Sequence, residues 1–249
     1  MKVALFIPCY VDQFYPNVGL ATVSILESLG VQADFPEAQT CCGQPMANSG
    51  CMPEAKPLAN KFVDVFRGYD YVVSPSGSCV SMVRNHYDHL VDKTDTAAAE
   101  VRSRTLELSE FLLHVLKIGP VQGRFPFQVG VHQSCHGLRE LRLGPSSEVM
   151  APRDSLLQQL LGGLEGIRFS TLARRDECCG FGGTFAVAEA GVSAMMGEDR
   201  INDHMHAGTQ VLTAGDMSCL MHLEGLIRRR KIPMRVMHFA EILAEAMTG

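Results

Sequence analysis

The sequence has no apolar run near the roughly 18 residues that a membrane-spanning helix requires. Its first run, residues 3–7, stops at Pro8, which is too soon for a signal-peptide core, and no small-residue cleavage site follows. Basic residues are not in excess either, because the formal net charge is −5, which argues against a nucleic-acid partner. These absences predict a cytoplasmic protein without a transmembrane segment.

Several familiar motifs are missing as well. The sequence contains no Walker loop, no G-x-G-x-x-G after an apolar run, and no G-x-S-x-G elbow, so nucleotide and serine-hydrolase chemistry have no support. It also lacks the C-x₂₋₄-C knuckles of structural zinc sites. The 249 residues, 46% hydrophobic and 20% charged, suit a globular protein of one large domain or two modest ones.

The number and the arrangement of the cysteines are unusual. There are nine cysteines, and four of them form two adjacent pairs, Cys41-Cys42 and Cys178-Cys179. Disulfide frameworks belong to small secreted domains, which this chain does not resemble. The cysteines therefore indicate metal ligands or redox groups, with burial of some as small hydrophobes as the alternative.

The chain also contains an internal repeat. Four segments of the first half recur in the same order in the second: 3–9 with 127–135, 41–43 with 178–180, 71–79 with 211–219, and 104–112 with 235–243. Two copies of one unit, joined near Gly119-Pro120, explain this order best. We therefore expect one lobe over residues 1–118 and a second over residues 119–249.

Each copy alternates short apolar runs with helical patterns. This alternation predicts an α/β fold of two pseudo-symmetric repeats, each a small parallel sheet flanked by helices. In the first copy we expect strands at 3–8, 31–35, 72–73 and near 106, and helices at 18–29, 55–66, 80–90 and 109–116. In the second copy we expect helices at 156–161, 194–206 and 220–230.

The predicted topology places most cysteines at the carboxyl ends of strands, where the loops of open α/β sheets converge. Each lobe then offers four thiols. The first cysteine set is Cys9, Cys41, Cys42 and Cys79, and the second cysteine set is Cys135, Cys178, Cys179 and Cys219. Cys51 has no counterpart in the second copy, so we interpret it as structural.

Thiolates are soft ligands that select zinc, copper(I) or iron–sulfur clusters. Adjacent cysteines tend to point apart in extended backbone, which favours a cluster of several metal atoms over a single ion. Glycine follows both pairs, at Gly43 and Gly180, and allows backbone amides to approach cluster sulfur. A colourless zinc-binding structural module remains the competing interpretation.

The spacing of the first set resembles the cysteine-rich CCG domain, because 31 residues separate Cys9 from Cys41 and 36 separate Cys42 from Cys79. That domain occurs in tandem in the cysteine-rich subunit of heterodisulfide reductase and in the glycolate oxidase iron–sulfur subunit. The chain length and the stretch 178–185 resemble the lactate-utilisation protein A family. This resemblance implies one or two iron–sulfur clusters, most simply [4Fe–4S], held by the eight cysteines, with zinc possible in one lobe.

The resemblance also implies a function and partners. It points to an electron-transfer subunit of a complex that oxidises L-lactate to pyruvate, docked against a ferredoxin-like iron–sulfur subunit and a third subunit. Heterodisulfide reductases close each motif with Cys-x-x-Cys, whereas this chain has Met82 and His222 there. That difference weakens the alternative of thiol–disulfide chemistry, while four thiolates per lobe still suffice for [4Fe–4S].

Three histidines lie near the second set in sequence: His132, His136 and His222. They could complete a mixed ligand set, bond to cluster sulfur or relay protons, or they could be polar residues on a solvent-facing rim. Binding a hydroxy acid usually requires an arginine and a general base. Arg139, Arg142 and His136 are the candidates near Cys135, and no motif singles out any of them.

Overall fold

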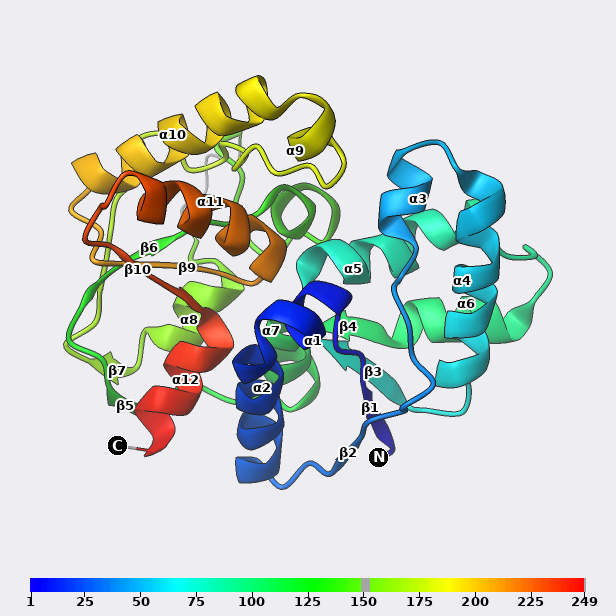
Figure 1. The fold of residues 1–249 in the computed structure, drawn as a ribbon. Helices are drawn as coiled ribbons and strands as arrows, with labels where there is room; N and C mark the ends of the chain where they lie inside the picture. Colours follow the sequence, from blue (N-terminus) through cyan, green and yellow to red (C-terminus); the bar gives the residue numbers. More distant parts are fainter. Residues whose placement is uncertain (149–152, 249) are drawn as a thin grey trace.

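Two parallel sheets with the same strand order form the centre of the protein (Figure 1). The computed structural model describes residues 1–148 and 153–248. The first sheet runs β2-β1-β3-β4 and the second runs β8-β6-β9-β10, so each strand has a counterpart in the other lobe. The register agrees too, because Val3 pairs with Tyr71 as Val129 pairs with Val211. The expected α/β fold of two pseudo-symmetric repeats is confirmed.

The strands are short, and their bounds follow the apolar runs. In the first sheet they are β1 (Val3–Leu5), β2 (Ala33–Asp34), β3 (Tyr71–Ser74) and β4 (Thr105–Glu107). In the second they are β6 (Gln128–Val131), β8 (Arg168–Phe169), β9 (Val211–Ala214) and β10 (Arg235–His238). A third, two-stranded sheet of β5 (Gly123–Arg124) and β7 (Leu164–Glu165) was not predicted from the sequence.

Helices cover both sheets. In the first lobe they are α1 (Cys9–Phe14), α2 (Pro16–Ser28), α3 (Gln44–Asn48), α4 (Met52–Phe66), α5 (Gly77–Ser81), α6 (Thr96–Arg104) and α7 (Leu108–Glu110). In the second they are α8 (Leu156–Leu161), α9 (Phe185–Ala188), α10 (Ala190–His206), α11 (Met217–Arg229) and α12 (Phe239–Thr248). Among the described residues, no helix has both the length and the apolar character needed to cross a membrane.

The helix expected at 80–90 differs from the prediction. It is divided into α5, a π-helical turn at Met82–His86 and a 3₁₀ turn at Tyr87–His89. Tyr87 is fully buried, and its hydroxyl donates a hydrogen bond to the backbone oxygen of Cys42 at 2.9 Å. Widened turns of this kind are frequent beside functional sites. The break therefore coincides with a tertiary contact between Tyr87 and Cys42. The counterpart of this segment in the second lobe, α11, is a regular helix.

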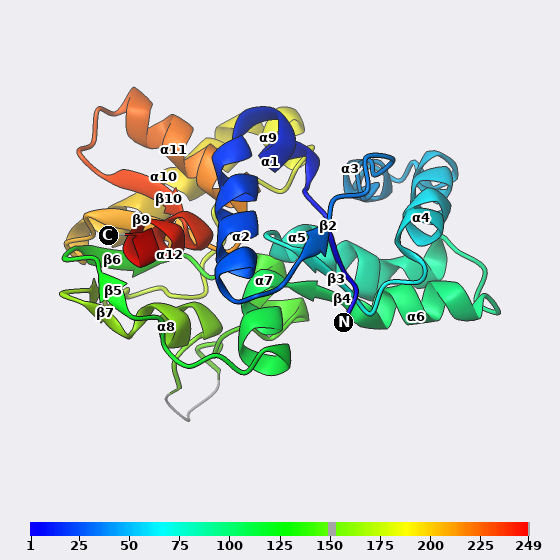
Figure 2. The same ribbon diagram turned by 90° about the horizontal axis from the view of Figure 1, so that it is seen from below.

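The two lobes share a hydrophobic core. Helices α2 and α12 lie side by side between the sheets (Figures 1 and 2). Ile25 of α2 and Leu243 of α12 belong to one buried cluster together with Val3 of the first sheet and Val129 of the second. The division into lobes at residues 118 and 119 stays a prediction based on the repeat.

The loops that follow the two equivalent central strands, β3 and β9, meet at the lobe boundary. Ser76 and Asp216 form an isolated antiparallel bridge, and the amide of Gly77 donates to the oxygen of Gly215 at 3.1 Å. Because α5 and α11 begin directly after this bridge, it fixes their first turns, and hence Cys79 and Cys219, relative to each other.

A buried carboxyl group lies close to the same boundary. Glu107, the last residue of β4, is fully buried; one carboxyl oxygen accepts from the amide of Ser109 at 2.7 Å, and the other has no partner among the described residues. Burial raises the pKa of Glu107 to about 8. The protonated side chain therefore stabilises the folded state fully at low pH, and this contribution is lost as the pH rises from about 4.5 to about 8.

We therefore expect Glu107→Gln to flatten the pH dependence of unfolding. In the native chain, the free energy of unfolding should fall by up to about 1.4 kcal/mol per pH unit within that window because of this group. Urea denaturation from about pH 5 to about pH 8 measures the slope, with exposed Glu37→Gln as control. An unchanged slope in Glu107→Gln would show that the carboxyl is not buried as described.

Candidate metal centre

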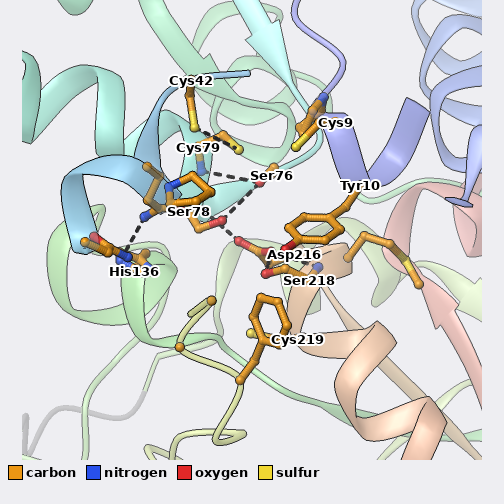
Figure 3. A pocket seen from close by; sticks show the side chains of 18 of the residues that line it. Cys9, Tyr10, Cys42, Ser76, Ser78, Cys79, His136, Asp216, Ser218 and Cys219 are labelled. Atoms are coloured by element: carbon orange, nitrogen blue, oxygen red, sulfur yellow. Dashed lines mark hydrogen bonds between the residues drawn. The ribbon is translucent and has the colours of Figure 1, made fainter. Parts of the chain in front are cut away.

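All eight cysteines of the two sets line one cavity of about 120 Å³ between the lobes. Figure 3 shows Cys9, Cys42 and Cys79 on one side of this cavity and Cys219 on the other. The loops after the strands of both sheets supply the lining, as the predicted topology requires. The two sets therefore face a common space between the lobes.

In the first set, the thiols contact one another in a chain. The Sγ atoms of Cys42 and Cys79 lie 3.6 Å apart, and both side chains are buried. The thiols of Cys42 and Cys9 donate to Cys41, and the amide of Gly43 approaches Cys41 Sγ at 3.4 Å. These hydrogen bonds lower the pKa of Cys41, while the same bond to Cys41 and burial raise the pKa of Cys9.

The second set repeats this arrangement. The thiols of Cys135 and Cys179 donate to Cys178, whose pKa they lower, and the amide of Gly180 approaches Cys178 Sγ at 3.3 Å. The bond to Cys178, a bond to Cys219 and burial raise the pKa of Cys179. Each set thus has one acidified thiol between neighbours that hold their protons, and a bound metal would displace those protons.

The expectation that adjacent cysteines point apart is wrong for this protein. Cys41 and Cys42 form a thiol hydrogen bond, and so do Cys178 and Cys179. The glycine after each pair has a left-handed backbone, with φ +84° at Gly43 and +89° at Gly180, which reverses the chain and accompanies the convergence of the two sulfurs. Such a pair can therefore bind a single metal ion as well as a cluster.

Cys51 lies outside the cavity. It is exposed, immediately before α4, and its thiol lies 3.9 Å from the backbone oxygen of Ser49. All nine cysteines are free thiols. An exposed cysteine contributes little to a core, so Cys51 has neither the position of a ligand nor the burial that a structural role would entail.

The histidines occupy three different environments. His136 lines the cavity and lies 3.3 Å from the amide of Gln44 in the other lobe (Figure 3), and His222 bonds to the backbone oxygen of Ser193 at 3.2 Å. His132 is not on a solvent-facing rim, because only 1% of its surface is exposed. Burial and the positive charge of Arg200 lower the pKa of His132 to about 3, so the ring is neutral at pH 7.

Asp216 is a cavity residue that sequence reasoning missed. It is buried, and its carboxylate accepts from the amides of Ser78 at 2.7 Å and Ser218 at 3.1 Å, one from each lobe (Figure 3). It therefore caps the helices that carry Cys79 and Cys219. The repeat could have drawn attention to Asp216, because it aligns this residue with Ser76, at a position where the two copies differ.

No arginine or lysine of the described chain lines the cavity, although the charge of Arg139 acts on Cys135. Its lining includes His136 but neither Arg139 nor Arg142, and no other arginine or lysine among the described residues. The arginine candidates for binding a hydroxy acid are thus not in position. Apart from the cysteines, the polar side chains of the lining are those of Asp216, His136 and Tyr10, together with serines and amides.

The donor chemistry of the lining fits an iron–sulfur cluster. Such clusters are commonly held by four thiolates, and each set supplies four free thiols that line the cavity. Backbone N–H groups directed at sulfur, at Gly43 and Gly180, are of the kind that tunes cluster potentials. Phe181 and Tyr10, whose ring centroids lie 5.7 Å apart, add an apolar wall that spans the lobes.

Comparison with known proteins agrees with the repeat. A family model described as a cysteine-rich domain matches residues 3–84 and again residues 129–224. The chain is 41% identical to lactate utilization protein A of Halalkalibacterium halodurans over 98% of its own length and 96% of that protein. It is 40% identical to the protein of the same name from Bacillus subtilis, over 98% and 99% of the two chains.

A solved structure shows a similar fold. A hypothetical protein from Helicobacter pylori superposes with a TM-score of 0.56 at 12% identity, over all of this chain and 49% of the other. At this identity the likeness concerns the fold alone.

Proposed function

This chain belongs to the lactate utilization protein A family and is built from two copies of the cysteine-rich domain, and from this premise we propose that it is an iron–sulfur electron-transfer subunit of a complex that oxidises L-lactate to pyruvate. The observation that carries the proposal is the convergence of eight free thiols on one cavity. Soft, clustered thiolates in a cavity without cations among its described lining suit cluster binding better than substrate binding.

The residues that would hold a cluster in the first lobe are Cys9, Cys41, Cys42 and Cys79. An iron–sulfur cluster supplies one-electron redox chemistry when bound. The chain contributes the ligands, the amide of Gly43 toward Cys41, and the apolar surroundings of Cys42 and Cys79, which keep water from the sulfurs. These surroundings are the factors that set a cluster potential.

Lactate oxidation releases two electrons and two protons, whereas such a cluster carries electrons one at a time. The proposed role therefore needs a second centre, in this chain or in a partner, and an acceptor beyond it. We propose a ferredoxin-like iron–sulfur subunit and a third subunit as the partners. One edge of the cavity is lined by residues of α3 and by Gly182 and Gly183, and beside it the hydroxyls of Ser49 and Thr184 lie 3.4 Å apart across the lobes.

Thiol–disulfide chemistry has less support. The position that closes the motif in heterodisulfide reductases is taken by Met82, which is buried, and by His222, which is engaged with Ser193. Neither side chain can form a disulfide or a bridging thiolate.

Metal and sulfide analysis tests the proposed function directly. We expect anaerobically purified protein to be brown, to contain iron and acid-labile sulfide, and to show broad sulfur-to-iron absorption that dithionite bleaches. Anaerobic handling is essential because clusters near solvent are lost to oxygen. Colourless protein that contains zinc and no sulfide would contradict the proposal.

A further inference from the structure

The two cysteine sets pack against different side chains. Beneath the first set lie three phenylalanines, namely Phe6 after β1 and Phe62 and Phe66 on α4. The ring centroids of Phe62 and Phe66 lie 4.9 and 5.7 Å from that of Phe6. Cys42 and Cys79 pack against this aromatic group in the same buried cluster. The first set therefore has no imidazole on its buried side, where the possible metal ligands are sulfur atoms and the Tyr87 hydroxyl is engaged with the backbone oxygen of Cys42.

Histidine takes the place of Phe6 in the second lobe. The amide of Phe6 donates to the oxygen of Val73 in β3, and the amide of His132 donates to the oxygen of Thr213 in β9. Since β3 and β9 occupy the same place in the two sheets, His132 is the counterpart of Phe6.

Helix α10 differs from α4 in the same way. A Cβ at Gly43 would meet the backbone oxygen of Ala55, and a Cβ at Gly180 would meet that of Ser193, so Ala55 and Ser193 are equivalent. Phe62 and Phe66 lie seven and eleven residues after Ala55, and Arg200 and His204 lie seven and eleven after Ser193. The three phenylalanines of the first lobe thus correspond to His132, Arg200 and His204.

The surroundings of His132 leave its ring nitrogens free to bind a ligand. It is buried, and neither ring nitrogen has a hydrogen-bond partner among the described residues. A ring nitrogen of His132 and the Sγ atoms of Cys179 and Cys219 all lie within 4.8 Å of one another. No other three histidine, cysteine or acidic groups in the described chain come this close. Buried polar atoms left unpaired are costly, and such groups in a native protein need an explanation.

We propose that the second cysteine set is a mixed imidazole–thiolate site, in which His132, Cys179 and Cys219 bind one divalent ion of the zinc class. Cys178, which is hydrogen-bonded to Cys179, supplies the fourth ligand. Zinc is bound tetrahedrally at about 2.3 Å from sulfur and about 2.0–2.1 Å from nitrogen, so small side-chain rotations close the observed spacing. The thiols release their protons to solvent on binding.

The rest of the buried group supports such a site. Arg200 is fully buried, and one of its nitrogens is paired with Asp203 at 3.1 Å while Nε and Nη2 have no partner among the described residues. Although Arg200 is paired with Asp203, its guanidinium also interacts electrostatically with Cys179, one of the proposed ligands. Space for the polar residues is provided at Gly130, where a Cβ would lie 2.3 Å from the ring of His204; the counterpart in the first lobe is Ala4.

The test uses the full-length chain with Cys9→Ser, Cys42→Ser and Cys79→Ser, which leave one thiol in the first set, after removal of all metal under reducing conditions. One equivalent of Zn²⁺ is added, and X-ray absorption at the zinc edge reports its ligands. We expect one nitrogen shell at about 2.0–2.1 Å beside sulfur at about 2.3 Å. His132→Phe, which installs the residue of the first lobe, should remove the nitrogen shell and weaken Zn²⁺ binding at least about tenfold in competition with a chromophoric chelator.

The matched control is His222→Met, which also installs the first-lobe residue and should leave both readings unchanged. If His132→Phe fails to fold, His132→Cys decides, because it should retain Zn²⁺ in an all-sulfur shell. Zinc bound through sulfur alone in the His132 protein, or a folded His132→Cys that binds no zinc, would overturn the proposal. Iron and sulfide are absent from this test, so its failure leaves the proposed electron transfer untouched.

Discussion

Replacing Cys42 by serine is expected to remove nearly all iron and sulfide from the first cysteine set. Cys42 is buried, its Sγ lies 3.6 Å from the Sγ of Cys79, and its thiol is hydrogen-bonded to Cys41. It therefore lies in the middle of the chain of contacting thiols. Serine has the same shape and is slightly smaller, but it replaces a soft thiolate by a hydroxyl, a ligand that iron–sulfur clusters rarely accept. Iron, sulfide and visible absorption per mole of protein measure the loss.

The same measurement on Cys179→Ser tests whether the two sets are separate. The thiol hydrogen bonds that shift the pKa values of Cys41 and Cys178 come from thiols of the same set. Cys179→Ser should therefore empty the second set and leave the iron of the first. Cys51→Ser is the control and should change nothing, because Cys51 is exposed and outside the cavity.

One outcome would change the description of the cavity. Both sets line a common space, so a single centre shared between the lobes is the alternative to two separate ones. If Cys42→Ser and Cys179→Ser each removed all metal while the protein stayed folded, the eight cysteines would belong to one centre. Circular dichroism of both variants establishes that the fold is intact.

The fold was predictable because its determinants are local and occur twice. Apolar runs of strand length alternate with helical patterns, and parallel strands bring their carboxyl ends to one edge. Those two facts place Cys9 and Cys79 near each other without any knowledge of packing. The break after α5 was not predictable, because it accompanies a bond from Tyr87 to Cys42, residues far apart in sequence.

The environment of the cysteines was harder to predict. The sequence around His132 is compatible with a polar rim, because Gln133 and His136 follow it closely. Its alignment with Phe6 carried the correct signal, since a residue that replaces a core phenylalanine in a repeat is itself buried. The cap by Asp216 depends on how the lobes meet, which hydrophobic periodicity within each lobe does not encode.

The isolated chain is expected to show no lactate-dependent dye reduction, even when it is loaded with its metal centres. The sequence contains no flavin or nicotinamide fingerprint, and hydroxy-acid oxidation normally relies on such a cofactor or an equivalent acceptor. Activity should appear only when the partner subunits are added. The assay compares the chain alone, the partners alone and the mixture under anaerobic conditions.

The electrostatics of the cavity lead to the same expectation independently of cofactors. Lactate is an anion, and carboxylates are recognised by arginine or lysine, neither of which lines the cavity in the described chain. In the metal-free lining, Asp216 and the acidified thiols Cys41 and Cys178 are anionic groups, which disfavour a carboxylate there. We therefore expect lactate to bind to another protein, and the role proposed for this chain is then limited to electron transfer. Robust turnover by the chain alone would refute this and place the reaction beside Cys135 and His136, where the lining offers a base.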